Sequence, residues 1–198
     1  MIRRISACTA LLLSLTACGI GSRPAEELYI LHAQKPAVSK GAVATTISIA
    51  NPEAAPGLDS PRIAVTDAPN HLTYYTGAAW AQSLPVLIQQ FLIDSFQQSG
   101  AFANVSNDQD ELIPNVTLLT DIRKYEVDTT VPGPMVRIRI VATLVSASHK
   151  SIATFTVEKT AVADANHMPN IVAAFDKATN EAAKDILRGV IKSKYGKK

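Results

Sequence analysis

The stretch VRIRIVATL, Val136–Leu144, carries the clearest secondary-structure signal in the chain. All of its even-numbered residues are apolar, and polar side chains fall between them at Arg137, Arg139 and Thr143. Successive side chains of a strand point to opposite faces of a sheet, so this stretch has one apolar face and one mixed face. It therefore predicts a half-buried β-strand whose apolar face covers the core.

A second alternating stretch follows at 151–159 and predicts an antiparallel hairpin with the first, turning around 147–150. Further runs rich in β-branched and aromatic residues predict more strands, and the Pro-rich segment 51–61 between them predicts a loop. The predicted strands lie at 28–31, 44–49, 62–65, 72–75, 102–105 and 115–127.

The mixed face of this strand, continued by one residue to 145, holds the candidate docking residues Arg137, Arg139, Val141 and Val145. Antiparallel sheets commonly leave such a face to water, so two interpretations stay open. The four residues form either a solvated face or an interface with a partner. In both cases the arginines are expected to be solvated in the free protein. Reversing their charges should then change the stability by no more than about 1 kcal/mol.

Helical spacing replaces the period of two after Trp80, where large apolar residues recur every three or four positions. The pattern predicts a helix from Ser83 to Ser99, with Trp80 at the start of its buried stripe. Ser83 suits the N-cap position, and Gly100 suits the position that ends a helix. Proline is tolerated in a first helical turn, so Pro85 does not contradict this prediction.

A second apolar stripe runs from Met168 to Val190 and predicts a second amphipathic helix. The order strands, helix, strands, helix predicts an α+β fold, a largely antiparallel sheet with both helices on one face. No repeat or long linker interrupts residues 27–192, which we predict to form one domain. Residues 193–198 form a basic tail that is either solvated or in contact with anionic lipid headgroups.

The first seventeen residues combine a basic start with an apolar run, as secretion signals do. The run is shorter than the roughly 20 residues that a membrane-spanning helix needs. It ends in Leu15-Thr16-Ala17-Cys18, which resembles the bacterial lipobox, where a cysteine thiol takes a lipid group. We predict a signal peptide at 1–17, lipid attachment at Cys18 and a lipidated tether at 18–26.

The alternative to a lipid anchor is an ordinary secretion signal with an incidental cysteine. A polar tether containing Pro24 follows Cys18 at once, which favours the anchor. Ile20 stands two residues after the cysteine where an aspartate would signal retention in the inner membrane, so the pattern resembles outer-membrane sorting. The only other cysteine, Cys8, lies in the signal, so the mature chain is predicted to fold without a disulfide.

Charge and motif content argue against several classes of function. Removing the two arginines of the signal leaves 17 basic and 17 acidic residues, from 19 and 17, so no basic footprint for nucleic acid remains. The chain has no G-x-S-x-G, H-E-x-x-H or phosphate-loop motif, and its four histidines lie in separate segments. We predict no catalytic residues, no metal site and no cofactor, and hence no enzyme.

Besides the lipobox, a tyrosine pair leads to Trp-Ala and a helix that ends in Ser-Gly-x-Phe-x-x-Val. Together these segments, which follow one another over nearly the whole mature chain, resemble the ABC-type transport auxiliary lipoproteins, the PqiC-like family. The segment 125–134 departs from the pattern. The matching segments are Tyr29–Leu31, Pro61–Val65, Leu72–Tyr75, Trp80-Ala81 and Ser99–Val105.

The resemblance implies an outer-membrane lipoprotein on the periplasmic face that accompanies an MCE-domain protein. Through that protein it would serve an inner-membrane ABC permease and ATPase that move lipids or other hydrophobic compounds. A docking or scaffold role is expected, because the chain has no phosphate loop with which to energise transport. Whether the chain also self-associates is left open. The alternative is a structural or assembly lipoprotein of the envelope without a transport role.

Overall fold

A computed structural model describes residues 26–37, 43–110 and 112–195. The predicted signal peptide, Cys18, all but the last residue of the tether and residues 196–198 of the basic tail lie outside these ranges. The elements in chain order are β1 (Glu27–Tyr29), β2 (Val43–Ile49), β3 (Glu53–Ala54), β4 (Arg62–Ala68), β5 (His71–Trp80), α1 (Leu84–Ser99), β6 (Phe102–Asn107), β7 (Val116–Asp128), β8 (Met135–Ser146), β9 (Ser151–Val162) and α2 (Met168–Tyr195).

The sheet of nine strands is organised around β7. Along one edge β7 pairs with β8 over its full length, and β8 continues to β9 in the predicted antiparallel hairpin. Along its other edge β7 pairs with three short strands in succession, β2, β3 and β4, all parallel to it. The β6 strand lies outside β2, while β5 and then β1 lie outside β4.

The α+β class and the order of strands and helices agree with the prediction, and the sheet is mostly antiparallel, but it is mixed because it also contains parallel pairs. Its long pairs, β4–β5, β7–β8 and β8–β9, are antiparallel. Five shorter pairs, β1–β5, β2–β6, β2–β7, β3–β7 and β4–β7, are parallel. Alternation within one strand reports which face is buried and not the direction of its neighbour, so the sequence pattern missed the parallel pairs.

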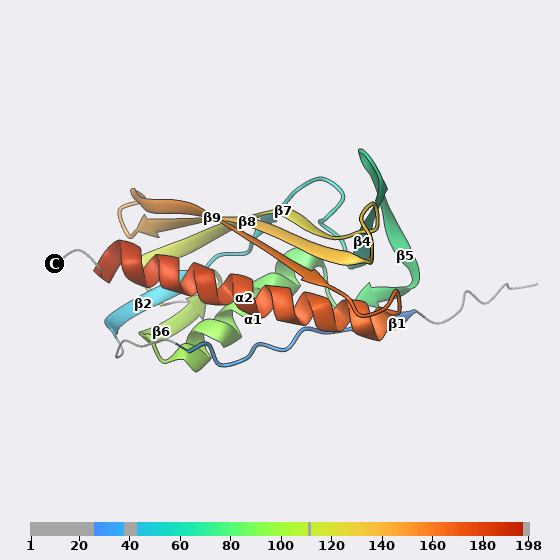
Figure 1. The fold of residues 1–198 in the computed structure, drawn as a ribbon. Coiled ribbons are helices and arrows are strands. Elements are labelled where there is room, and N and C mark those ends of the chain that lie inside the picture. The colour runs from blue at the N-terminus through green and yellow to red at the C-terminus, as the bar shows by residue number, and fades with distance from the viewer. Residues whose placement is uncertain (1–25, 38–42, 111, 196–198) are drawn as a thin grey trace, which may run out of the picture.

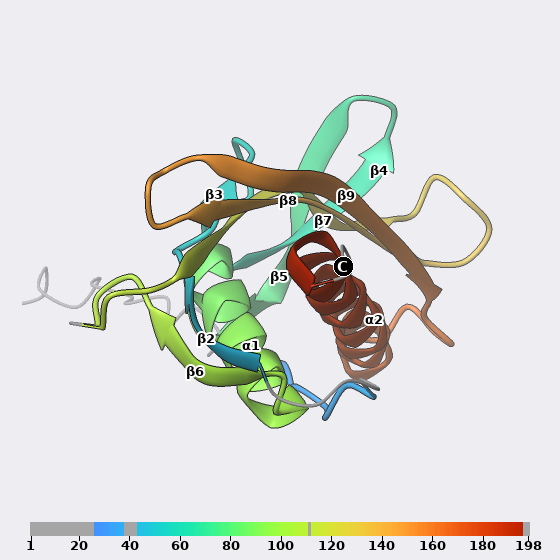
Figure 2. The same ribbon diagram turned by 90° about the vertical axis from the view of Figure 1, so that its left-hand side faces the viewer.

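Both helices lie inside the concave side of the curved sheet, as predicted, with α2 under β8 and β9 and α1 beside β6 and β2 (Figure 2). Viewed from the side, α2 runs along the length of the molecule beneath the β7–β9 strands (Figure 1). The buried side chains of the sheet and of both helices form one hydrophobic cluster. Neither of the two helices in the described ranges covers the outer face of β7–β9 (Figure 2).

The predicted limits of α1 are nearly those observed. Gly100 ends the helix in the left-handed region, at φ 64°, where glycine has no Cβ to clash. Ser83 precedes the first turn, but its side chain makes no capping hydrogen bond, so the predicted cap is wrong in its chemistry. Trp80 ends β5 rather than opening the helix stripe, although it is buried as expected, at 2% exposure.

Two other predictions differ from the structure in detail. The segment 51–61, predicted as loop, contains the two-residue strand β3. The second helix continues through Tyr195, so part of the predicted basic tail is helical. The residues of its predicted stripe are buried or half-buried, and the hairpin turn at 147–150 forms as predicted, with the Ser146 amide donating to the Lys150 carbonyl at 2.9 Å.

Phe91 on α1 offers a direct test of this core, because its side chain is 3% exposed. We expect Phe91→Ala to lower the free energy of unfolding by about 3–5 kcal/mol, the usual cost of emptying an aromatic core site. Val86 on the same helix is 42% exposed, so Val86→Ala is the matched control and should change little. Urea denaturation measures both, and equal midpoints for the two variants would contradict this packing of α1.

Candidate docking surface and N-terminal strap

The outer face of β7–β9 is built from the strand positions that alternate with the buried ones. Along β8 the buried residues are Val136, Ile138, Ile140, Ala142 and Leu144, as the sequence predicted. The cross-strand register places Arg137 between Glu126 and Thr160, and Arg139 between Lys124 and Glu158. Neighbouring side chains in such rows share one face of the sheet. The face therefore carries charges of both signs in adjacent rows.

Arg137 is less free than the sequence suggested. Its Nε lies 2.7 Å from a carboxylate oxygen of Asp128, a residue whose side chain is only 11% exposed. The Thr130 hydroxyl and amide both donate to Asp128, at 2.6 and 2.8 Å. The Thr130 hydroxyl bond, followed by the Thr130 amide and Arg137, holds the pKa of Asp128 below its ordinary value despite partial burial. Asp128 therefore remains charged and keeps Arg137 in place.

Arg139 pairs with Glu158 across the β8–β9 hairpin, at 2.8 Å between Nε and a carboxylate oxygen. Both side chains are at least half exposed, at 50% and 61%. An exposed pair of this kind contributes little to stability, about 0–1 kcal/mol. The two candidate arginines thus differ: Arg137 belongs to a half-buried polar cluster, and Arg139 is available to a partner.

The apolar candidates line up beside the charged rows. Val141 stands between Asp121 and Thr156, and Val145 stands between Thr117 and Ser151. A shallow hollow of about 330 Å³ opens next to Val141, and the exposed Leu119 forms part of its wall. The structure therefore places all four candidates on one continuous outer surface, with a charged end and a more apolar end.

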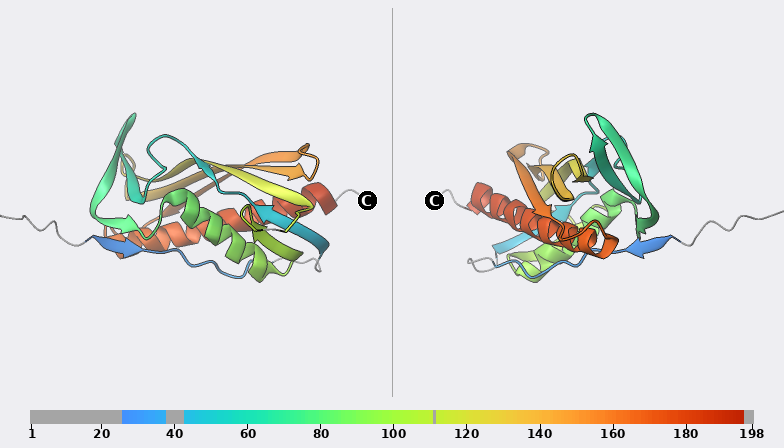
Figure 3. Two further views of the ribbon diagram at one scale, coloured as in Figure 1. Left: turned by 180° about the vertical axis from the view of Figure 1, so that it is seen from behind. Right: turned by 45° about the vertical axis from the view of Figure 1, so that its right-hand side comes forward.

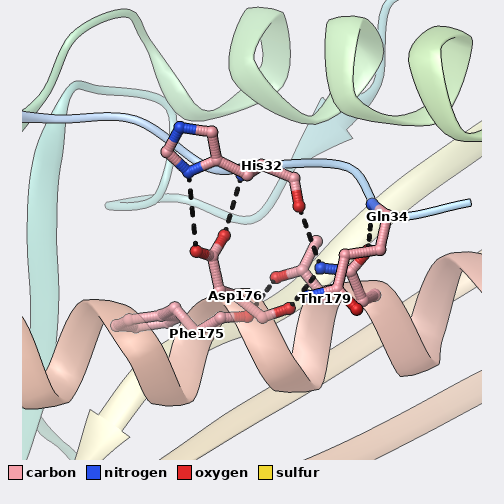
Figure 4. Close-up of polar contacts among 6 residues, drawn as sticks. His32, Gln34, Phe175, Asp176 and Thr179 are labelled. Atoms are coloured by element: carbon pink, nitrogen blue, oxygen red, sulfur yellow. Dashed lines mark hydrogen bonds and ion pairs between the residues drawn. The ribbon is translucent and has the colours of Figure 1, made fainter.

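A second feature links the domain to the tether. Residues 30–37 form a strap that runs in extended form along α2, on the side of the helices away from the β7–β9 strands (Figures 1 and 4). The His32 amide donates to the Asp176 carboxylate at 2.9 Å, and the Gln34 amide donates to the Asn180 side chain at 2.7 Å. The Asn180 amide group donates back to the His32 carbonyl at 3.0 Å.

Asn180 thus gives the strap one donor and one acceptor, as a neighbouring strand would. Gln98 of α1 adds a donor to the Ala33 carbonyl at 3.3 Å, so both helices hold the strap. The sequence patterns above did not point to these residues. The available signal was the polar pair Asp176 and Asn180, four residues apart beside the buried stripe of α2, which places both on one helix face.

The structure bears only on part of the prediction that the chain has no catalytic or metal site. Across the described ranges, no three His, Cys, Asp or Glu side chains gather as ligands of a metal ion would. His32 lies on the strap, His71 and His149 at strand turns and His167 just before α2.

Among the helices in the described part of the chain, none is both long and apolar enough to cross a membrane.

The fold is shared with several solved proteins. XCC0632 of Xanthomonas campestris, which carries the family label DUF330, is 25% identical with a TM-score of 0.77, over 84% of this chain and 95% of that one. An uncharacterized protein is 11% identical with a TM-score of 0.66, over 84% and 99%. The hypothetical protein CT253 of Chlamydia trachomatis is 6% identical with a TM-score of 0.54, over 76% and 98%. The last two show likeness of fold alone.

These likenesses define a class of α+β proteins with a mixed sheet around two helices. The chain belongs to the ABC-type transport auxiliary lipoprotein component family, whose model matches residues 29–187. That description gives the family an envelope lipoprotein role in ABC transport and names no enzymatic activity. No protein of curated function matches the chain. The resemblance found in the sequence is therefore confirmed at the level of the family.

The unequal partners of the two arginines lead to a prediction that replaces the one made from sequence. We expect Arg137→Glu to destabilise the domain by about 2 kcal/mol or more, because it leaves the Asp128 carboxylate unpaired beside Glu126. Arg139→Glu should cost at most about 1 kcal/mol, because its partner is exposed. Thermal and urea unfolding of both variants measure the difference. Equal effects would show that Arg137 is as solvated as Arg139.

Proposed function

We propose that this protein is a lipid-anchored docking component of an MCE-type ABC transport system for lipids or other hydrophobic compounds. It would be held at the periplasmic face of the outer membrane and would bind its partner through the outer face of β7–β9. The family membership carries the transport part of this proposal. The MCE partner, the outer membrane and the anchor at Cys18 rest on the sequence and on the resemblance it shows.

The tether limits where the domain can act. Residues 18–26 span at most about 30 Å when fully extended, since each residue adds no more than about 3.6 Å. A chain acylated at Cys18 therefore keeps the domain close to the membrane surface, and a partner must reach the domain there. Multiple acyl chains would make the anchor stable, at about 0.8 kcal/mol for each buried CH₂ group.

The position of the outer face supports a docking role. The β7–β9 face lies on the opposite side of the molecule from the strap that leads to the tether (Figure 1). A partner could therefore occupy this face while the domain stays anchored. Exposed charges such as Arg139 and Glu158, next to the apolar end at Val141 and Val145, offer both charge complementarity at short range and contact area.

The runner-up is a structural or assembly lipoprotein of the envelope. The two functions differ in their partners. A transport auxiliary binds components of one ABC system, and its loss should give the same phenotype as loss of the ATPase. A structural lipoprotein should be independent of that ATPase. The family description favours the first function.

The anchor is tested by Cys18→Ser in the full-length protein. We expect this variant to lose acylation and to leave the membrane fraction, while the domain keeps its unfolding midpoint, because the described core is formed by residues from Tyr29 onward. Mass spectrometry of the mature N-terminus and membrane fractionation after high-salt washing measure the outcome. Retention of the variant in outer membranes would contradict the lipid anchor.

The docking face is tested by the double variant Arg139→Glu with Val141→Glu. We expect it to fold and to be acylated, yet to lose most of its co-purification with the MCE-domain protein, because like charges across an interface repel strongly. Lys177→Glu, an exposed change on α2, is the matched control and should leave co-purification intact. Unchanged co-purification of the double variant would show that this face is solvated and does not bind the partner.

A further inference from the structure

An open hollow of about 800 Å³ lies at the end of the domain where the tether arrives. Its lining comes from three places: Glu26 just before β1, Arg62 at the start of β4, and residues 73–77 of β5. The β4–β5 hairpin projects from the rest of the molecule beside β1 (Figure 3). None of these residues belongs to the β7–β9 face or to the strap, so the hollow is a separate site.

Arg62 is the main cation of this hollow. Its guanidinium stacks over the Tyr74 ring at 3.6 Å from the centroid, and the Tyr74 hydroxyl donates to the Gly57 carbonyl at 2.9 Å. Within the described residues Arg62 makes no ion pair with a carboxylate, unlike Arg137 and Arg139. A stacked guanidinium keeps its fork of donors free and oriented, which suits a phosphate group.

The backbone of β5 makes room beside Arg62. Ala64 pairs with Tyr74, but Arg62 pairs with Ala79, so β5 bulges outward between these two positions. Gly77 lies in this bulge at φ 75°, a left-handed conformation that favours glycine, and no atom approaches within 4 Å of its missing Cβ. The bulge therefore leaves an open space next to the cation.

Apolar side chains flank the same end of the molecule. Leu28 stands in register with Ala79, which also pairs with Arg62, so the three residues form one cross-strand row. Leu28 is 64% exposed, and Ile30, two residues further on, is 53% exposed. Exposed aliphatic residues beside a basic group, directly after a short tether, fit contact with a membrane surface.

The charges in the hollow select among headgroups. Arg62 supplies one positive charge and Glu26 one negative charge at the same opening. An anionic headgroup would meet Glu26 unfavourably. A zwitterionic headgroup would place its phosphate on Arg62 and its ammonium group near Glu26, so both charges would be matched.

We propose that the hollow formed by Glu26, Arg62 and the β5 bulge binds the zwitterionic headgroup of a phosphoethanolamine lipid in the membrane that holds the anchor. Arg62 would bind the phosphate, Glu26 would bind the ammonium group, and Leu28 and Ile30 would face the acyl layer. The membrane as the source of this ligand rests on the anchoring part of the proposed function. The choice of headgroup does not rest on the anchoring, because it follows from the residues that line the hollow.

The test is an NMR titration of the ¹⁵N-labelled mature acylated protein in neutral detergent. The probes are glycerophosphoethanolamine, glycerophosphoglycerol and inorganic phosphate, with the amides of residues 73–77 as the readout. We expect saturable shifts with glycerophosphoethanolamine and weaker responses to the other two. Arg62→Gln should raise the dissociation constant about tenfold or more, as expected for loss of a charge-assisted contact. Glu26→Gln should remove the preference for the ethanolamine probe.

Arg188→Gln, an exposed arginine change on α2, is the matched control and should leave the titration unchanged. Unshifted amides in β7–β9 would show that each variant remains folded. Equal responses to all three probes would reduce the hollow to an unselective anion site and overturn the proposal, as would no response. Neither result would bear on the proposed docking of a partner, because docking is assigned to the outer face of β7–β9 and is measured by co-purification.

The source of the headgroup is tested in vesicles that contain phosphatidylethanolamine with brominated acyl chains. In the acylated protein carrying Leu28→Trp, we expect the new indole to be quenched by bromine, and Arg62→Gln in the same protein to reduce that quenching. Trp80 is 2% exposed and supplies a constant background. Quenching no greater than that background would place this end of the domain away from the membrane and overturn the proposed source.

Discussion

The packing of three aromatic side chains, Trp80, Tyr125 and Phe175, fixes the arrangement on which the other features depend. Phe175 stacks on Tyr125 at 4.9 Å and meets Trp80 edge-on at 5.2 Å, so the cluster joins β5, β7 and α2. The Thr179 hydroxyl donates its one proton to the Phe175 carbonyl, so the Tyr125 hydroxyl must be the donor to Thr179, at 2.7 Å. Burial raises the pKa of Tyr125 well above its ordinary value, which keeps this donor neutral. Asp176 and Asn180, which hold the strap, directly follow the buried residues Phe175 and Thr179 in the sequence of α2 (Figure 4). One segment of α2 therefore serves the core with one face and the strap with the other.

Features that depend on local pattern could be predicted from the sequence, and features that depend on distant partners could not. The alternation of β8 predicted its buried face, and Gly100 predicted the end of α1. The parallel pairing of β2, β3 and β4 with β7 could not be predicted this way, because each of these strands is short and β7 lies 60 or more residues away in the chain. The sequence placed Arg137 on the correct face but gave no sign of its pairing with Asp128, because alternation shows which face a side chain is on and not which side chain of the next strand it meets. The anchor prediction at Cys18 lies outside the described residues and stays a prediction.

The paired charges of the β7–β9 face bear on how a partner would bind. Arg139 with Glu158 and Arg123 with Asp121 are already matched within the domain, so the face has local charges of both signs and little net field. Such a surface would discriminate among partners by the arrangement of charges more than by long-range attraction. Arg137 and Asp128 would contribute differently, because their half-buried pair holds the end of β7 against β8. A docking partner would thus meet one held charge pair at Arg137 and Asp128 beside the more exposed side chains of Arg139 and Glu158.

The direction of β1 has a mechanical consequence. β1 runs parallel to β5, and the strap then continues along α2, so the first described segment of the chain is held along its length by successive hydrogen bonds. A pull on this segment from the membrane side, directed along β1, would act on these bonds in shear, so that several must break together. A segment attached at right angles would instead peel away one bond at a time. Tension between a fixed lipid and a bound partner would therefore reach the core through β5 and α2 before the strap came loose.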